Sequence, residues 1–468
     1  MISAAFISKR TIFILLAAFI VSIFLYTRLH NFENRYSFDH DAEQTANAAW
    51  KIIVEKKPIL IGQETSVGGL FVGPFLWWIQ TAAMYLGHLN PISLGYLGVV
   101  ASFATLIMFF LVTSEISNRW QALLASFLYV ISTRLIIFDL SGIALTYIML
   151  YTLIFLWLSI KIFVQNKIHF FPVLAFLTSI AFHIHFSLLL LIPIIAVLII
   201  LQKPAIPKKY LFHSAILFLF PLFTFVLFDL RHDFLITNKL INFASTQNET
   251  SSFRIFQTTS TQFSFLIESI FFKTKYFVLF FFLLIGYFIY LMRKQGREKL
   301  LYLLLLLLFL PLALLWFYKG SIPEYYFLPT VPIFMIIAGF VYSDIFKKSR
   351  LLFAVVLGLS IFYNLNNFKE IRENSQSFNI KLKIVDSVIS DSGPDSFNIY
   401  YQMPPGIDKG YRYLFKWRGH APQEDGKNLY ILEFINPNEF QIEKYLKTYP
   451  QKKVLVQPIG FVHIVSVK

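Results

Sequence analysis

The sequence contains no cysteine among its 468 residues. Zinc ribbons, iron–sulfur clusters, thiol catalysis and disulfide-stapled external domains are therefore excluded. Charge is also scarce, because Asp, Glu, Lys and Arg make up 14% of the chain while hydrophobic residues make up 57%. A soluble globule of this size needs more charge on its surface. The composition indicates a membrane protein.

Apolar runs near the ~20 residues that cross a bilayer recur along most of the chain. They predict an all-α polytopic membrane domain over residues 1–365, with about eleven crossings. The first run follows Lys9 and Arg10, and no small-residue cleavage site comes after it, so we expect it to remain as a helix. The predicted crossings lie near residues 11–27, 92–113, 120–138, 143–163, 170–184, 186–201, 210–228, 276–292, 299–317, 327–345 and 350–365.

The net charge of +15 fits this topology. The basic clusters of the short loops, such as those within 203–209, 293–299 and 347–350, fall on one side of the membrane, as the positive-inside rule requires. The longer loops on the other side carry most of the acids. We therefore expect a multi-pass plasma-membrane protein with a cytoplasmic N-terminus, and nucleic acid is set aside as a partner.

Residues 68–87 are apolar but do not fit this count, because a crossing here would move Lys161 and Lys167 to the outer side. We predict a helix that lies in or dips into the outer interface, where Trp77 and Trp78 are favoured. A short crossing, with another helix miscounted, is the alternative.

Residues 366–468 have a composition close to that of a soluble domain. Strand-like runs begin at residues 397, 428, 452 and 461, and helix-like runs lie near 376–390 and 437–448. This pattern predicts a small extracytoplasmic α/β domain, here called the tail.

The strongest candidate site is the acidic segment "FDHDAEQ", residues 38–44, in the first outer loop. In a helix Asp39 and Glu43 would share a face and Asp41 would point away, whereas in a strand all three would share a face. The first arrangement leaves Asp41 as a free base beside a pair suited to a cation or a shared proton. A solvated acidic start to an interfacial helix is the structural alternative.

The motif "FDLRHDF", residues 228–234, opens another long outer loop. Arg231 offers two parallel donors suited to a phosphate, and His232 lies beside it. The alternative is a salt-bridge cluster in which Asp229 or Asp233 holds the arginine.

Two more outer segments carry polar side chains. His183 and His185 in "AFHIHF" face roughly opposite directions on a helix, which argues against joint metal binding, but one of them could face a polar cavity. Tyr325 and Tyr326 in "EYYFLP" stand at an outer junction, where tyrosines often form an interfacial belt. Together these clusters outline an external cavity at the membrane surface, suited to a phosphorylated head with a lipid tail.

In this order, the motifs resemble those of the GT-C glycosyltransferases, most of all the prokaryotic branch related to protein O-mannosyltransferases and to the transferases that put aminoarabinose on lipid A. The resemblance covers about residues 8–365 and includes "LIGQETSVGGLFVGPFLWW", "FHIHFSLLLLIP" and "EYYFLPTVP". The family usually has an Asp-Glu pair in the first outer loop, where this chain reads Asp41-Ala42 with Asp39 and Glu43 beside it. By position, Asp41 matches the catalytic acid.

The resemblance implies inverting transfer of a hexose or pentose from a polyprenyl-phosphate donor to an acceptor hydroxyl on a glycan, lipid or protein at the outer side. Asp41 would act as base, with Asp39 and Glu43 nearby, and Arg231, His232, His183, His185, Tyr325 and Tyr326 would bind substrate. No cofactor is required by the sequence, and a divalent cation on the three acids is left open because relatives differ. A non-catalytic scaffold of polysaccharide assembly and a lipid or glycan transporter are the competing functions.

Overall fold

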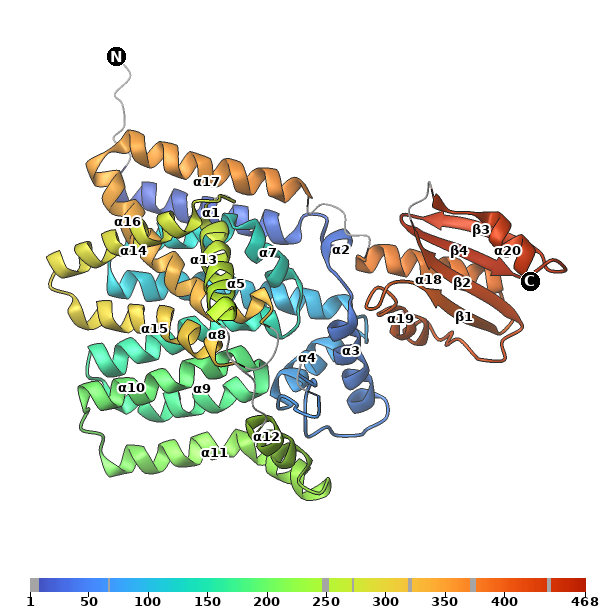
Figure 1. The fold of residues 1–468 in the computed structure, drawn as a ribbon, viewed down its shortest axis with the longest axis horizontal. Coiled ribbons are helices and arrows are strands. Elements are labelled where there is room, and N and C mark those ends of the chain that lie inside the picture. The colour runs from blue at the N-terminus through green and yellow to red at the C-terminus, as the bar shows by residue number, and fades with distance from the viewer. Residues whose placement is uncertain are drawn as a thin grey trace, which may run out of the picture.

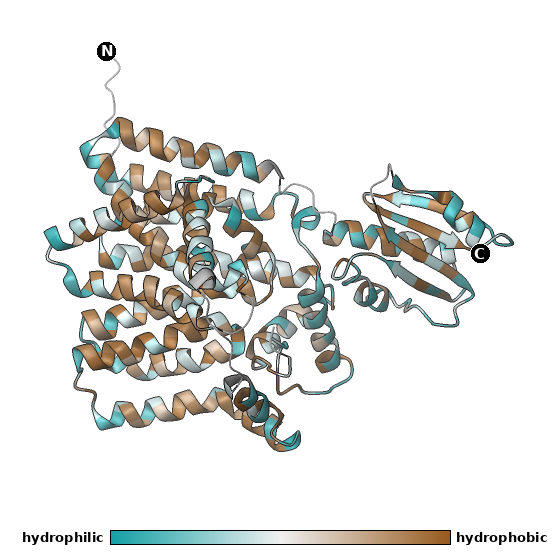
Figure 2. Ribbon diagram, viewed as in Figure 1, coloured by the Kyte–Doolittle hydropathy of each residue, from teal (hydrophilic) through white to brown (hydrophobic). Residues whose placement is uncertain are grey.

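The computed structural model describes residues 8–65, 68–245, 252–271, 273–318, 322–370, 376–435 and 439–468. It consists of a helical bundle with a small α/β domain attached at one end (Figure 1). Hydrophobic residues dominate the bundle, whereas hydrophilic and hydrophobic residues are mixed in the tail (Figure 2). The predicted fold class is confirmed.

Helices occupy all eleven segments that we predicted to cross the membrane. Within the described residues, eight helices are long and apolar enough to span a bilayer, a bent pair adds a ninth, and two apolar helices are shorter. The bundle contains α1 (Lys9–Leu29), α5 (Ile92–Ile116), α6 (Arg119–Ile131), α7 (Thr133–Leu140), α8 (Ala144–Ser159), η1 (Ile160–Val164), η2 (Ile168–Phe170), α9 (Phe171–Ile184), η3 (Phe186–Leu191), α10 (Ile192–Gln202), α11 (Lys208–Arg231), α14 (Phe277–Lys294), α15 (Glu298–Trp316), η4 (Glu324–Thr330), α16 (Val331–Lys348) and α17 (Arg350–Glu370).

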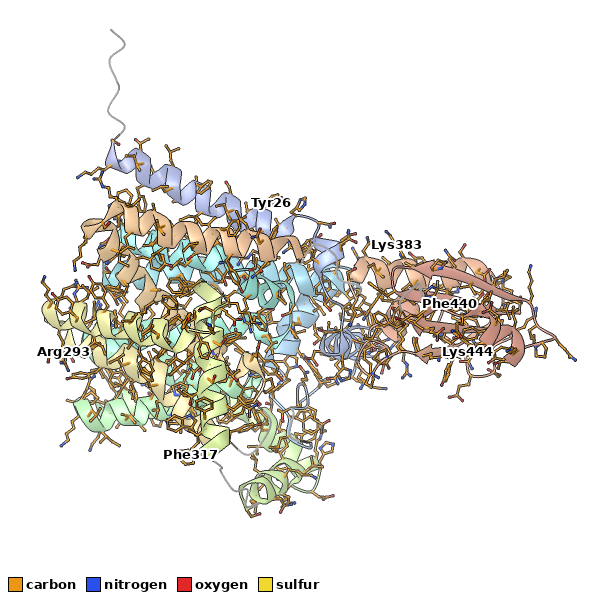
Figure 3. All side chains as sticks on the ribbon, turned by 45° about the horizontal axis from the view of Figure 1, so that its top comes forward. Tyr26, Arg293, Phe317, Lys383, Phe440 and Lys444 are labelled. Carbon is orange, nitrogen blue, oxygen red and sulfur yellow. The ribbon has the colours of Figure 1, made fainter. Side chains whose placement is uncertain are left out.

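Helix α16 forms the centre of the bundle, because every residue from Val331 to Tyr342 is buried. By contrast, α1, α11 and α17 lie at the periphery and expose large apolar side chains such as Phe19, Phe220 and Phe362, as lipid-facing helices do. The cationic end of α14, marked by Arg293, lies far from the tail (Figure 3). This separation is the one that the predicted topology requires.

The structure corrects three details. The segment 120–138 is not one helix but the pair α6 and α7, bent by 72° at Ser132. The bend is held by Asn364, whose side-chain oxygen accepts from the amide and hydroxyl of Thr133 at 2.9 and 3.0 Å. Helix α17 continues beyond the predicted domain boundary at residue 365. The second long outer loop contains α12 (Leu235–Ser245) and α13 (Ser252–Ile270).

The first outer loop forms three short helices: α2 (Phe32–Arg35) before the acidic segment, α3 (His40–Ile53), which contains most of it, and α4 (Phe75–Leu86) after it. Helix α4 has 12 residues. It is therefore about 18 Å long at 1.5 Å per residue, too short for a hydrocarbon core of about 30 Å. Residues 68–87 thus contain no helix long enough to cross, which agrees with the interfacial interpretation.

The tail contains a four-stranded sheet in the order β1-β2-β4-β3, with β1 parallel to β2 and the other pairs antiparallel. All four strands lie where the sequence predicted them, and two of the three helices do as well. The helix after β1 was not predicted. The elements are α18 (Phe378–Ser392), β1 (Phe397–Gln402), α19 (Tyr411–Trp417), β2 (Asn428–Phe434), α20 (Ile442–Thr448), β3 (Val454–Ile459) and β4 (Val462–Val467).

A fully buried ion pair joins the outer ends of α1 and α7. The guanidinium of Arg28 donates to Asp139 Oδ2 at 2.7 and 3.2 Å and to the carbonyl of Val130 at 2.6 Å. The hydroxyl of Tyr129 donates to the same carboxylate oxygen at 2.9 Å. Buried charges are tolerated only when they are paired and hydrogen-bonded in this way.

We predict that Asp139→Asn destabilises the protein by about 3–5 kcal/mol, because Arg28 would remain buried without its counter-ion. The measurement is thermal unfolding of the purified protein in lipid. Asp386→Asn is the control, because Asp386 forms an exposed pair with Arg418, and exposed pairs contribute about 0–1 kcal/mol. Equal melting temperatures for both variants would show that the buried ion pair stabilises the protein no more than the exposed pair does.

Candidate active site

The acidic segment adopts the helical alternative. Asp39 is the N-cap of α3, and its side chain accepts a hydrogen bond from the amide of Ala42 at 3.1 Å. An aspartate in this position satisfies a backbone N–H that the first turn leaves free. Asp39 and Glu43 therefore face one side of α3, and Asp41 faces another.

Two short segments, residues 62–65 and 70–73, pair as the arms of a hairpin and bring a partner to Asp41. Its two arms are joined by hydrogen bonds from Gly62 N to the Val72 carbonyl at 2.7 Å and from Val72 N to the Gln63 carbonyl at 2.9 Å. The side-chain amide of Gln63 donates to Asp41 Oδ1 at 2.6 Å. This hydrogen bond orients the carboxylate, and the other oxygen has no hydrogen-bond partner within the described residues.

Asp41 and Gln63 line a cavity of about 120 Å³ at the end of the bundle that carries α3. The cavity joins the first outer loop to the start of α8, the start of η3 and the start of η4. Its remaining walls are mostly apolar, with a few polar groups that converge on them, as is usual for a small-molecule site. The other lining residues are Glu64, Thr65, Val72, Ile143, Ala144, Leu145, Ile184, His185, Phe186, Tyr325 and Tyr326.

This environment makes Asp41 a better base than an exposed aspartate. Burial raises the pKa of Asp41, and the negative charge of Asp39 raises it further. His40 and the hydrogen bond from Gln63 act in the opposite direction. A carboxylate with a raised pKa binds a proton more readily, which suits general-base catalysis.

Asp39 and Glu43 turn away from this cavity and toward the tail. Burial raises the pKa of Asp39, and the Ala42 amide and Lys381 oppose this shift. Glu43 is buried, and its Oε1 accepts a hydrogen bond from the backbone N of Tyr413 at 3.0 Å. The three acids therefore do not fit a shared cation site, and no metal-suited group of three His, Cys, Asp or Glu occurs within the described ranges.

The two histidines have different surroundings. His185 lines the cavity, accepts from Ser187 N at 3.1 Å, and lies with its ring centre 5.5 Å from those of Tyr325 and Tyr326. The ring of His183 is buried and stacks on Phe75 at 4.4 Å. Only His185 is therefore placed to meet a ligand in this cavity.

Arg231 and His232 lie at the exposed end of α11 and do not line the cavity. His232 stacks on Phe228 at 4.0 Å. The neighbouring Asp229 does not hold Arg231 but accepts the backbone amides of Ile236 and Thr237 at 2.8 and 3.1 Å, which caps the start of α12. The assignment of Arg231 to a phosphate stays a prediction.

A cation close to the cavity was not predicted from the sequence. Arg134 in α7 forms ion pairs with Glu268 of α13 at 2.9 Å and with Glu324 of η4, directly before Tyr325. An arginine within an apolar run was a visible signal, since ionisable residues at membrane depth usually have a function. Gln63 gave no comparable signal, because its partner lies 22 residues away.

The chain is similar in fold to three solved structures. ArnT from Cupriavidus metallidurans, bound to undecaprenyl phosphate, matches with a TM-score of 0.62 at 10% identity over 98% of each chain. Its apo state gives 0.63 at 9% identity, also over 98% of each chain. The oligosaccharyltransferase of Archaeoglobus fulgidus, in complex with Zn and sulfate, gives 0.51 at 12% identity over 87% of this chain and 62% of that chain.

No protein-family model matches this sequence, and a search of curated proteins finds no match. The structural likeness is therefore a likeness of fold. The chain has the GT-C type of fold that the resemblance implied, and ArnT is a solved structure that shares this fold over the full length.

The glycine of the Gly-Pro segment, Gly73, packs directly against the buried ring of His183. A Cβ at Gly73 would lie 1.9 Å from Nδ1 of the buried His183 ring. We predict that Gly73→Ala sharply lowers the melting temperature and the yield of monodisperse protein, because this overlap forces the hairpin away from α9.

Gly286→Ala is the matched control, because a Cβ there meets nothing within 4 Å. Adding His183→Ala to Gly73→Ala should restore much of the lost stability, since the ring that clashes is gone. A double variant no more stable than Gly73→Ala alone would contradict this account.

Proposed function

We propose that the protein is a membrane glycosyltransferase that moves a hexose or pentose from a polyprenyl-phosphate donor to an acceptor hydroxyl on the outer side of the membrane. The observation that carries this proposal is the carboxylate of Asp41, oriented by Gln63 at a mostly apolar cavity and with a raised pKa. The fold shared with ArnT, whose structure holds undecaprenyl phosphate, supports it.

The reaction needs one base and one stabilised leaving group. Asp41 accepts the proton of the acceptor hydroxyl as its oxygen attacks the anomeric carbon. The bond from that carbon to the phosphate oxygen breaks, and polyprenyl phosphate leaves with the electron pair, so the sugar configuration inverts. No general acid is required, because the phosphate is already a good leaving group. Base catalysis of this kind typically contributes about 10²- to 10⁴-fold in rate.

Charge that develops on the phosphate calls for a nearby cation. Arg231 is the residue predicted from the sequence, and it is solvent-exposed and free to swing toward a lipid phosphate at the surface. Arg134 is a second candidate because its partner Glu324 adjoins the cavity residue Tyr325. The side chains of His185, Tyr325 and Tyr326 then supply polar contacts to the sugar.

The donor's lipid and the acceptor enter from different surroundings. In this proposal the polyprenyl chain remains in the bilayer beside the exposed apolar faces of peripheral helices, and the acceptor glycan, lipid or protein approaches from the outer side. We propose the plasma membrane as the location, with the N-terminus in the cytoplasm and the tail outside. We propose the same division into a membrane domain and the tail, with the boundary moved from residue 365 to the end of α17 at Glu370.

We predict that purified protein in lipid releases polyprenyl phosphate from one member of a panel of radiolabelled polyprenyl-phosphate sugars. Asp41→Asn should lower the rate by about 10²- to 10⁴-fold, because it removes the base and keeps the shape. Asp39→Asn should cost less, since asparagine is also a good N-cap. Asp395→Asn, on an exposed ion pair of the tail, is the neutral control.

The same assay, run with and without a divalent ion, tests metal dependence directly. Release by wild type but not by Asp41→Asn would establish the transferase and identify the sugar. No release with any donor, from folded protein that binds the lipids, would favour the scaffold or the transporter.

The raised pKa of Asp41 predicts a pH dependence. Because the base must be ionised, kcat/KM should fall as pH drops, with an acid limb above the ordinary aspartate pKa of about 3.9. Gln63→Met removes a hydrogen bond that stabilises the carboxylate, so it should raise the pKa of Asp41 and move the limb to higher pH. Gln451→Met on the exposed surface should leave the limb in place, and a limb unmoved by Gln63→Met would argue against Asp41 as the base.

A further inference from the structure

The tail reaches back to the acidic segment through a buried cation. Lys381 lies in the first turn of α18, and its side chain is fully buried. Its ammonium donates to the carbonyl of Phe38 at 2.9 Å and to the carbonyl of Lys409 at 2.7 Å. Phe38 is the residue directly before Asp39, so this hydrogen bond fixes the point at which α3 begins.

The backbone on both sides of Phe38 is held by the same domain. The amide of Phe378 donates to the carbonyl of Tyr36 at 2.9 Å, and Ser37 forms a β-bridge with Ser377. From the other side, Gly410 with φ of +90° comes so close that a Cβ there would lie 2.5 Å from the Phe38 carbonyl oxygen. Residues 36–38 are therefore enclosed between α18 and the turn before α19.

The charges around Lys381 belong to both domains. Asp39 and Glu43 face it from the outer loop, and Asp408 faces it from the turn before α19. Burial lowers the pKa of Lys381 to about 8, and these three acids oppose that shift. Glu43 in turn receives the backbone N–H of Tyr413 in the first turn of α19. The tail thus supplies partners to both acids that flank Asp41.

We propose that Lys381 is a positioning residue for sugar transfer, which holds the Phe38 carbonyl and the start of α3 so that Asp41 faces the cavity. This inference rests on the function proposed above. Lys381 does not line the cavity and acts through Phe38 and Asp39. The tail is accordingly part of the scaffold of the active site, in addition to any contact it makes with an acceptor.

The test compares full-length variants in lipid. Lys381→Met keeps the length of the side chain and removes its donors and charge. We expect kcat to fall by up to about 10²-fold, as small misplacements of a catalytic group do, while the KM for the donor stays within about threefold. Lys381→Arg, which keeps the charge and donors, should recover part of kcat. Asn379→Ala, on the same helix, removes a hydrogen bond to Asn34 and should leave kcat unchanged.

A second readout does not depend on turnover. Hydrogen exchange over residues 36–45 should be faster in Lys381→Met than in wild type or Asn379→Ala. Faster exchange in Lys381→Met supports the positioning role whether or not the wild type shows transfer. Absence of transfer by the wild type would overturn only the proposed function. The positioning role would be overturned if Lys381→Met had the same exchange rates and kcat as the wild type. It would also be overturned if Asn379→Ala lost as much kcat and protection from exchange as Lys381→Met.

Gly410→Ala provides an independent route if Lys381→Met does not fold. A Cβ there would lie 2.5 Å from the Phe38 carbonyl oxygen and 3.4 Å from Lys381 Cδ, so it displaces the carbonyl while the ammonium group and its charge are retained. We expect the same loss of kcat and the same faster exchange over residues 36–45. A Gly410→Ala variant with wild-type kcat and exchange would overturn the proposal.

Discussion

The buried ion pair of Arg28 and Asp139 is the constraint on which the candidate site depends. Arg28 lies in the last turn of α1, just before the loop that carries Asp41, and Asp139 lies in the last turn of α7, whose first turn carries Arg134. Helices in a bilayer gain little from hydrophobic association with each other, so polar contacts and close packing set their register. A shift of α1 against α7 would move the acidic loop and Arg134 relative to each other.

Within one helical turn, three acids that look alike in the sequence have three different sets of contacts. Asp39 caps α3, Glu43 accepts the Tyr413 N–H in the first turn of α19, and Asp41 accepts from Gln63 at the cavity. The first two are held by backbone N–H groups, and the third keeps an oxygen available for a proton. The like charge of Asp39 nonetheless reaches Asp41 and helps raise its pKa.

Features encoded locally could be predicted from the sequence. The eleven helical segments and the four tail strands follow from the length and period of apolar runs, and the orientation of Asp41 follows from the helical alternative. Contacts between distant segments could not be predicted: Gln63 with Asp41, Arg134 with Glu268, and Lys381 with Phe38 each require the folded chain. The bend at Ser132 was missed because Asn364, which holds it, lies 231 residues from Thr133.

The contact between Lys381 and Phe38 spans 343 residues of sequence. The acidic segment leaves the ribosome early, with the first outer loop, but the lysine that holds it belongs to the last hundred residues. The segments between them must be made, and the tail must fold, before the start of α3 has its full set of partners. The surroundings of the acidic segment are therefore completed late in synthesis, so an incomplete chain would carry the three acids without the contacts that the tail supplies.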